Sequence, residues 1–499
     1  MMKIKKEREK WNQKSTGTKV DAGFFIMKSF TIVLCKSYEE KGKTMIQDMT
    51  TGKPTKKILL FALPMLLGNI FQQVYNLVDT IVVGRFVGPN ALAAVGSSFT
   101  MMTFVTSVII GLCMGAGVLI SQLFGAKDSI RMQRAIATSF YFIITITFVI
   151  MAITLIFINP ILVLFQTPQE IFADTKIYLT FIFWGLIFTF FYNFATCLLR
   201  AIGDSKTPLY ALIAACVVNV VLDLVFVIVF HWGVMGAALA TVIAQGISAL
   251  SGCLSAVKKL SFLQVKRENL IFDREMFRTT AHYSVLTSIQ QSIMNFGILM
   301  VQGLVNTFGA TAMAAFAAAV KIDSFAYMPV QEFGNAFSTY VAQNVGASQT
   351  DRVKRGVHSA IRTIILFCIV ISSLVLIFSH QLMMIFVEAS ETEIIDIGAQ
   401  YLCIVGIFYV LIGFLFMFYG FYRGIGQHSM SIILTILSLG TRVALAYLLA
   451  PTPVGLVGIW WAIPIGWAIA DLVGFVVYGR GKWTRFITDY QRHFEKQKN

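Results

Sequence analysis

The chain has 499 residues, of which 57% are hydrophobic and only 13% are charged. This excess of apolar residues is too large for a water-soluble protein of this length and indicates a helical membrane protein with many spans. The formal net charge of +15 does not indicate nucleic-acid binding, because the basic residues fall in short loops and tails between apolar segments. The sequence contains no HExxH, GxSxG or P-loop motif, so we expect neither an enzyme nor an ATP-driven pump.

Residues 1–48 differ from the rest because they are mostly basic and polar. Their apolar run, Phe24–Cys35, is interrupted by Lys28 and is too short to span a bilayer. It also lacks a cleavage site of small residues, which argues against a signal peptide. We interpret the segment as a disordered extension or as the result of a start codon assigned too early, with Met45 or Met49 as the alternative starts.

Hydropathy and helix-breaking residues predict twelve membrane helices. Their expected ranges are 58–83, 91–122, 132–158, 174–199, 209–230, 235–257, 279–304, 312–343, 356–379, 394–421, 429–450 and 456–478. Nearly all of the 40 Lys and Arg residues lie on one side if the even-numbered loops and both tails are cytoplasmic. This asymmetry predicts that the N-terminus and the C-terminus are both inside.

The longest inside loop, 258–278, separates six helices in 49–257 from six helices in 279–480 and leaves 481–499 as a cytoplasmic tail. The two groups resemble each other, since Gln122–Ala126 recurs as Gln343–Ala347 and Arg200–Gly203 recurs as Arg423–Gly426. Six is an even number, so both groups have the same orientation in the membrane. We therefore predict an all-α integral membrane protein of two six-helix bundles, related by a parallel pseudo-two-fold repeat around a central cavity.

In the first half, two carboxylates lie deep within apolar spans. Asp79 is in the first and Asp223 is in the fifth. A charged side chain at this depth costs roughly 2.5–3.5 kcal/mol, so its presence indicates an ion, a proton or a cationic substrate. Asp79 also ends a polar stripe with Gln72, Tyr75 and Asn76 at i, i+3, i+4, i+7 spacing, which places all four on one helix face.

Asn219 and Asp223 share a face of the fifth helix, and Thr241 lies at a similar depth on the sixth. These oxygen ligands, together with Asp79, suit a hard cation such as Na⁺. The same carboxylates are also able to carry protons. The sequence leaves both coupling ions open.

The second half lacks this acidic site. Its corresponding positions are Arg442 for Asn219, Ala446 for Asp223 and, approximately, Met300 for Asp79. The other polar candidates of the second half are Gln290, Gln291, Asn295, Lys321, Asp323, Glu332 and Arg442. Of these, Glu332 and Arg442 are candidates for an ion pair across the bundle.

Six segments of the chain carry a resemblance to a known family: Leu63–Asn69, Asn76–Gly84, Gln122–Ala126, Arg200–Pro208, Asn219–Asp223 and Gly233–Thr241. They resemble the multidrug and toxic compound extrusion (MATE) family, and the resemblance covers about residues 49–480. The resemblance implies two six-helix lobes and a secondary antiporter that exports lipophilic, often cationic compounds. It also implies inward flow of Na⁺ or H⁺ as the driving force, with no further cofactor.

The family's cation-binding residues match four positions of this chain: Asp79, Asn219, Asp223 and Thr241. Asn193 is the nearest candidate for an Asn that some members use on the fourth helix. Gln291 stands where one branch of the family has a glutamate, which makes this chain similar to the DinF-like and MepA-like branches. The resemblance further implies a monomer in the inner membrane of a bacterium, with small-molecule cations and membrane lipid as partners.

A lipid-linked precursor flippase is the alternative, because related exporters share this architecture. Such a protein is expected to line its cavity with several cations that bind pyrophosphate. Only Lys321 and Arg442 are cations that lie well inside the predicted spans, which favours the drug antiporter.

Overall fold

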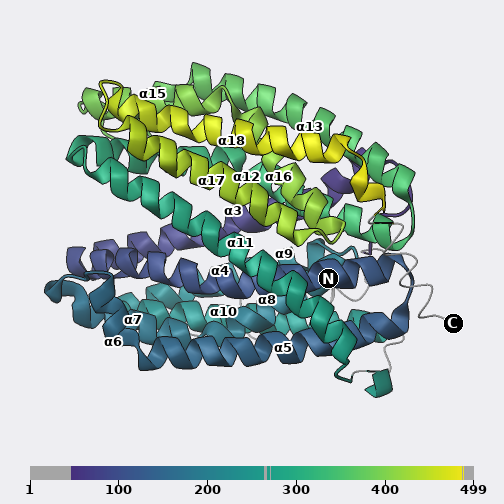
Figure 1. Cartoon of the computed structure of the whole chain (residues 1–499). Coiled ribbons are helices and arrows are strands. Elements are labelled where there is room, and N and C mark those ends of the chain that lie inside the picture. Colours follow the sequence, from purple (N-terminus) through teal and green to yellow (C-terminus); the bar gives the residue numbers. More distant parts are fainter. Residues whose placement is uncertain (1–45, 263–266, 270, 486, 488–499) are drawn as a thin grey trace, which may run out of the picture. The chain divides into compact units, whose positions relative to one another are not determined.

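The computed structural model describes residues 46–262, 267–269, 271–485 and 487, and within these ranges all regular elements are helices. The described residues from Gln47 onward form one compact unit, whose helices are drawn in Figure 1. The extension predicted over residues 1–48 lies outside the described residues, except for its last three.

The first half of the compact unit ends before the linker at residue 263. It contains α3 (Pro54–Phe86), α4 (Pro89–Gly125), α5 (Ser129–Ile156), α6 (Ile158–Leu164), α7 (Gln169–Trp184), α8 (Leu186–Ala201), α9 (Lys206–Asp223), the π-helix η2 (Leu224–Val229) and α10 (Gly233–Phe262). The second half contains η3 (Arg267–Asn269), α11 (Arg274–Asn306), α12 (Ala310–Gly346), α13 (Thr350–Ile377), α14 (Ser379–Met383), α15 (Thr392–Gly406), α16 (Tyr409–Gly424), α17 (His428–Leu449) and α18 (Gly455–Gly479).

Twelve spans are confirmed when each bent helix pair is taken as one span. Among the described residues, 10 helices are long and apolar enough to cross a membrane alone. Two further spans are broken, since α7 and α8 meet at a bend of 44° and α15 and α16 at a bend of 55°. The sequence analysis predicted these as continuous helices and missed the short helices α6 and α14.

The helix lengths confirm the internal duplication. α3 and α11 have 33 residues each, α4 and α12 have 37 each, and α5 and α13 have 28 each. A short helix and a bent pair follow in both halves. The repeated Arg-x-Ile-Gly motif ends the bent pair, and its glycines, Gly203 and Gly426, have φ of 89° and 84°, a left-handed conformation that favours glycine as a helix C-cap.

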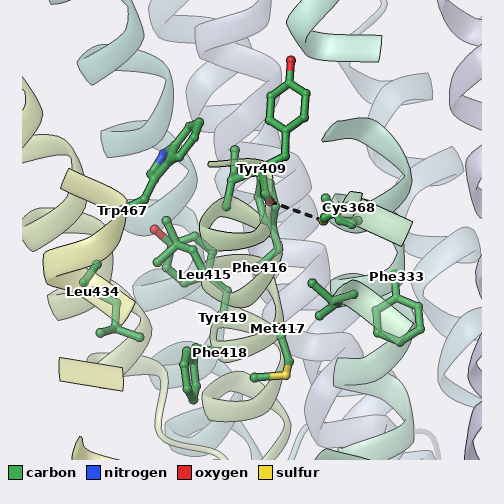
Figure 2. Close-up of a cluster of buried hydrophobic side chains, with 14 of the residues drawn as sticks. Phe333, Cys368, Tyr409, Leu415, Phe416, Met417, Phe418, Tyr419, Leu434 and Trp467 are labelled. Carbon is green, nitrogen blue, oxygen red and sulfur yellow. Dashed lines mark hydrogen bonds between the residues drawn. The ribbon is translucent and has the colours of Figure 1, made fainter. Parts of the chain in front are cut away.

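The interior of the second half is rich in aromatic side chains. Figure 2 shows Phe416, Phe418 and Tyr419 of α16 within this cluster, where the Cys368 thiol donates to the Tyr409 carbonyl at 3.4 Å. The outer surface is also apolar, with large side chains such as Leu366 of α13 70% exposed. An apolar exterior around a packed interior is the pattern of helices that face lipid.

The backbones of the two halves approach each other closely where α4 meets α11. A Cβ at Gly111 would lie 2.5 Å from the Ser288 Cα, and a Cβ at Gly115 would lie 2.5 Å from the Ser284 Cα. Small residues spaced four apart on both helices therefore let the two backbones touch, as in many membrane helix pairs. α11 also packs on α17, so it connects the halves (Figure 1).

Two equivalent hydrogen bonds join the halves where α4 and α12 end. The Gln122 side chain of α4 donates from Nε2 to the Gly424 carbonyl at 2.9 Å. Its repeat counterpart, Gln343 of α12, donates from Nε2 to the Ala201 carbonyl at 2.8 Å. Both glutamines are completely buried, and we call this reciprocal pair of bonds the latch.

The segment before α3 also contacts both halves. The Gln47 amide donates to the Gly203 carbonyl at 3.0 Å, and the Met49 amide donates to Gln343 Oε1 at 3.1 Å. Arg352 of α13 donates to the carbonyls of Met49, Thr51 and Gly52. The compact unit therefore includes Gln47, which the sequence analysis assigned to the extension.

These contacts predict different outcomes for the two alternative starts. A chain that begins at Met45 keeps every contact from Gln47 onward, so we expect its membrane level and melting temperature to equal those of the full chain. A chain that begins at Met49 loses the Gln47 bond and buries a charged amine, and a buried charge costs several kcal/mol. Thermal unfolding of the two purified proteins measures the difference, and equal melting temperatures would contradict this role of Gln47 and Met49.

Candidate functional site

The structure brings the four predicted cation ligands together in the first half. Asp79 comes from α3, Asn219 and Asp223 from α9, and Thr241 from α10, and each is at most 6% exposed. Asn219 donates from Nδ2 to Thr241 Oγ1 at 3.5 Å. Asp79 and Asp223 lie close enough for their carboxylates to interact electrostatically. We call these four residues the cation cluster.

Most oxygen atoms of the cation cluster have no protein partner. Asp79 Oδ1, Asn219 Oδ1 and both carboxylate oxygens of Asp223 are buried without a hydrogen bond. Within the described part of the chain, no Lys, Arg or His forms an ion pair with either carboxylate. Buried polar atoms are normally satisfied, so an unsatisfied group of this kind fits a bound Na⁺ or protons.

A break in α-helical geometry follows Asp223. The chain continues from α9 into the π-helix η2, in which the Phe230 amide donates to the Val225 carbonyl at 3.0 Å. The sequence analysis predicted a regular helix through residue 230. π-Turns occur frequently at functional sites, and here the irregular turn begins directly after a cluster carboxylate.

Tyr178 of α7 is a member of the site that the sequence analysis missed. It is 4% exposed and lies within electrostatic range of Asp79 and Asp223, with its hydroxyl beside Thr241. A single Tyr in an apolar helix carries no periodic signal. The one available signal was the repeat, because Tyr178 corresponds to Tyr401 in the second half.

A cavity of about 320 Å³ lies between the halves. Helices α3, α4, α8, α9, α11, α12 and α16 contribute to its wall, and four predicted polar residues line it: Gln72, Asn193, Gln291 and Glu332. Among the described residues, the wall does not include the cation cluster. The polar stripe of α3 connects the two sites, because Gln72 lines the cavity, Tyr75 contacts Gln72, and Asp79 belongs to the cluster.

The remaining predicted polar residues make local bonds. Asn76 donates to Gln73 Oε1 at 3.5 Å, Asn193 to the Thr189 carbonyl at 2.8 Å, and Asn295 to the Gln291 carbonyl at 3.2 Å. Each bond stays within one helix. The structure thus places Asn193 in the cavity and not in the cation cluster.

The expected ion pair between Glu332 and Arg442 is wrong. Glu332 Oε1 accepts from Asn69 Nδ2 of α3 at 2.8 Å and from Asn335 Nδ2 at 3.1 Å. Arg442 instead lies within electrostatic range of Asp323. The reason is that Glu332 is on the part of α12 that lines the cavity. Asp323, which Arg442 approaches, is on a part of α12 that does not line it.

Two cations of the cavity wall were also missed. Arg200 and Arg423 line the cavity from equivalent positions in α8 and α16. The hydropathy analysis placed both at the ends of spans and interpreted them as loop charges. Arg423 donates from Nη2 to Asn335 Oδ1 at 3.1 Å, so a polar chain connects it to Glu332.

Comparisons with known proteins agree with this architecture. A family model described as MatE matches residues 64–225 and 284–448, one segment in each half. The probable multidrug resistance protein YoeA of Bacillus subtilis is 30% identical over 451 residues, covering 88% of this chain and 96% of the relative. The multidrug export protein MepA of Staphylococcus haemolyticus is 24% identical over 426 residues, covering 85% of this chain and 93% of the relative.

Solved structures share the fold over nearly the same extent. One is described as the outward-facing conformation of a multidrug resistance MATE family transporter of the MOP superfamily. It superposes with a TM-score of 0.83 at 25% identity and covers 89% of this chain and 98% of its own.

The position of Tyr178 predicts a defined effect of its hydroxyl on ion binding. Tyr178→Phe keeps the ring, so we expect normal folding but weaker ion binding, by about two- to thirteenfold for one hydrogen bond worth roughly 0.5–1.5 kcal/mol. The ion concentration or pH that gives half-maximal thermal stabilisation of the purified protein measures this. Tyr401→Phe is the matched control, and an equal shift in both variants would contradict a specific role of Tyr178.

Proposed function

The chain belongs to the MATE family of multi-pass membrane transporters, and from this premise we propose that it exports lipophilic, often cationic small molecules in exchange for inward Na⁺ or H⁺. The names of its relatives, which include multidrug export proteins, support this substrate class. The bacterial sources of its relatives support an inner membrane location, and the asymmetry of Lys and Arg supports both termini inside. We propose a monomer as the working unit.

One observation carries the proposal. The cation cluster holds two buried carboxylates without a fixed cation, and α3 connects it directly to the cavity between the halves. Two negative charges in an apolar bundle repel each other and lack solvation. An ion that enters the cluster relieves both costs, so the free energy of α3 depends on whether the ion is bound.

We infer that α3 is the element through which ion and substrate act on each other. Asp79 and Gln72 are on the same helix, and Asn69 of that helix contacts Glu332 of the second half. A shift of α3 on ion binding therefore changes the cavity wall and its bond to α12. Such coupling requires only that ion and substrate prefer different positions of α3.

We propose that the latch closes one end of the cavity in this state. Alternating access requires that the Gln122 and Gln343 bonds break when the cavity opens at that end. Both bonds stabilise the state in which this end is closed. A variant that lacks one of them should therefore favour the state in which this end is open.

The flippase alternative is not favoured. Arg200 and Arg423 do add two cations to the cavity wall, but Glu332 lies in the same wall. The relatives that this chain matches over nearly their whole length have names that describe multidrug proteins.

The cation cluster predicts the effect of removing its charge. Asp79→Asn and Asp223→Asn each keep the side-chain shape, and we expect each to abolish export of a fluorescent cation from vesicles. The double variant should be no worse than either single variant, because one site loses its ion in each case. Imposing Na⁺ and proton gradients separately identifies the coupling ion.

Two controls accompany this measurement. Asp396→Asn removes an exposed carboxylate of α15 and should leave export unchanged. Glu332→Gln should give a partial defect through its contacts with Asn69 and Asn335. Normal export by Asp79→Asn together with complete loss in Glu332→Gln would place the ion site in the wrong half.

The latch predicts a shift between the two access states. Gln122→Ala or Gln343→Ala removes a buried bond worth roughly 0.5–1.5 kcal/mol, enough to change the ratio of states by up to about tenfold. Lys127 and Ser348 are exposed in the loops after α4 and α12. Spin labels attached at Lys127→Cys and Ser348→Cys should report the shift toward the open state as a longer distance between the two labels. Gln302→Ala, which breaks a bond within α11, is the control, and an unchanged distance in both latch variants would contradict the role of the latch.

A further inference from the structure

The second half has its own buried polar cluster at the position that corresponds to the cation cluster. Arg442 of α17 is the repeat counterpart of Asn219, and Tyr401 of α15 is the counterpart of Tyr178. Tyr401 donates from its hydroxyl to Asp323 Oδ2 of α12 at 3.2 Å. Asp323 is 6% exposed and Tyr401 is 1% exposed.

The two clusters differ in the source of positive charge. The first contains two carboxylates and no fixed cation, whereas the second contains one carboxylate and one guanidinium. Arg442 lies within electrostatic range of Asp323, Tyr401 and Tyr327, although farther from Asp323 than a direct ion pair. Asp323 Oδ1 and Arg442 Nε are both buried without a hydrogen bond.

The surroundings of Asp323 strengthen its interaction with Arg442. Trp460 packs edge-on against Tyr401 with ring centroids 5.0 Å apart and stacks on Phe316 at 5.3 Å. Phe316 and Trp460 are completely buried or nearly so. In such an apolar environment, opposite charges attract across several ångströms, because little water screens them.

We propose that Arg442 is a tethered counter-ion for Asp323, which gives the second half a permanent positive charge where the first half takes up an exchangeable ion. The pair of Asp323 and Arg442 is then electrically balanced in every state, so this cluster takes up no exchangeable ion. The inference rests on the proposed function for the exchange in the first half. The pairing of Asp323 with Arg442 is measurable without transport.

The titratable groups that face Asp323 come from four helices: Tyr327 of α12, Tyr401 of α15, Tyr409 of α16 and Arg442 of α17. Lys321 of α12 is exposed and lies over the Phe386 ring, 5.9 Å from its centroid. Arg442 is thus the cation that faces Asp323 within this group. Its replacement by a neutral side chain should convert the second cluster into a site that needs an external cation or a proton.

The test uses the full chain with a neutral first half. In the Asp79→Asn, Asp223→Asn background, we compare the melting temperature in sodium chloride with that in choline chloride, and at neutral with that at mildly acidic pH. When Arg442→Asn is added to this background, we expect Na⁺ or mild acid to raise the melting temperature by a few degrees more than in the background alone. Further addition of Asp323→Asn should remove this gain, and Arg442→Lys should not produce it.

The inference is overturned if Arg442→Asn responds to ions no more than the background does, or if its response survives Asp323→Asn. If Arg442→Asn does not fold, recovery of the folded protein in the Asp323→Asn, Arg442→Asn pair supports the pairing, and failure to recover overturns it. The proposed function fails separately, if Asp79→Asn and Asp223→Asn leave ion-driven export intact in the otherwise unaltered chain.

Discussion

The free energy of a charge buried in an apolar bundle governs how both halves of this protein are built. A carboxylate at this depth requires a counter-charge, a proton or a bound ion. In the first half, no described Lys, Arg or His pairs with Asp79 or Asp223. Asp79 Oδ1 and both carboxylate oxygens of Asp223 are buried without a hydrogen bond. The free energy of the site therefore depends strongly on a bound ion or proton, because a carboxylate that already has partners is stabilised little by an ion.

The connection between ion and cavity depends on ordinary helix geometry. One face of α3 carries Asn69, Gln72, Tyr75 and Asp79, so a single rigid element reaches the second half, the cavity and the cation cluster. Close contact of α4 with α11 at Gly111 and Gly115 holds the halves together on one side. On the side of α3 and α12, Asn69 and Glu332 bond to each other at the cavity wall.

The sequence predicted the spans, the repeat and the four residues of the cation cluster, because a carboxylate in an apolar segment is visible in hydropathy alone. It did not predict Tyr178, since one hydroxyl among apolar side chains has no periodicity. It also placed Arg200 and Arg423 in loops, because a span prediction ends at the first charge, whereas the helices continue along the cavity wall. The pairing assigned to Glu332 and Arg442 was wrong, since opposite charge does not specify which face of a helix each residue occupies.

The latch has the form of an isologous contact, in which Gln122 reaches the end of α16 and Gln343 reaches the end of α8. Contacts of this reciprocal kind join the identical subunits of two-fold homodimers. The two halves therefore have the interface of a dimer whose subunits became one chain. In a homodimer, an arginine at the position of Arg442 would appear in both subunits and would replace Asn219 as well. Fusion removed that restriction, so one copy was free to acquire a fixed charge while the other kept an ion site.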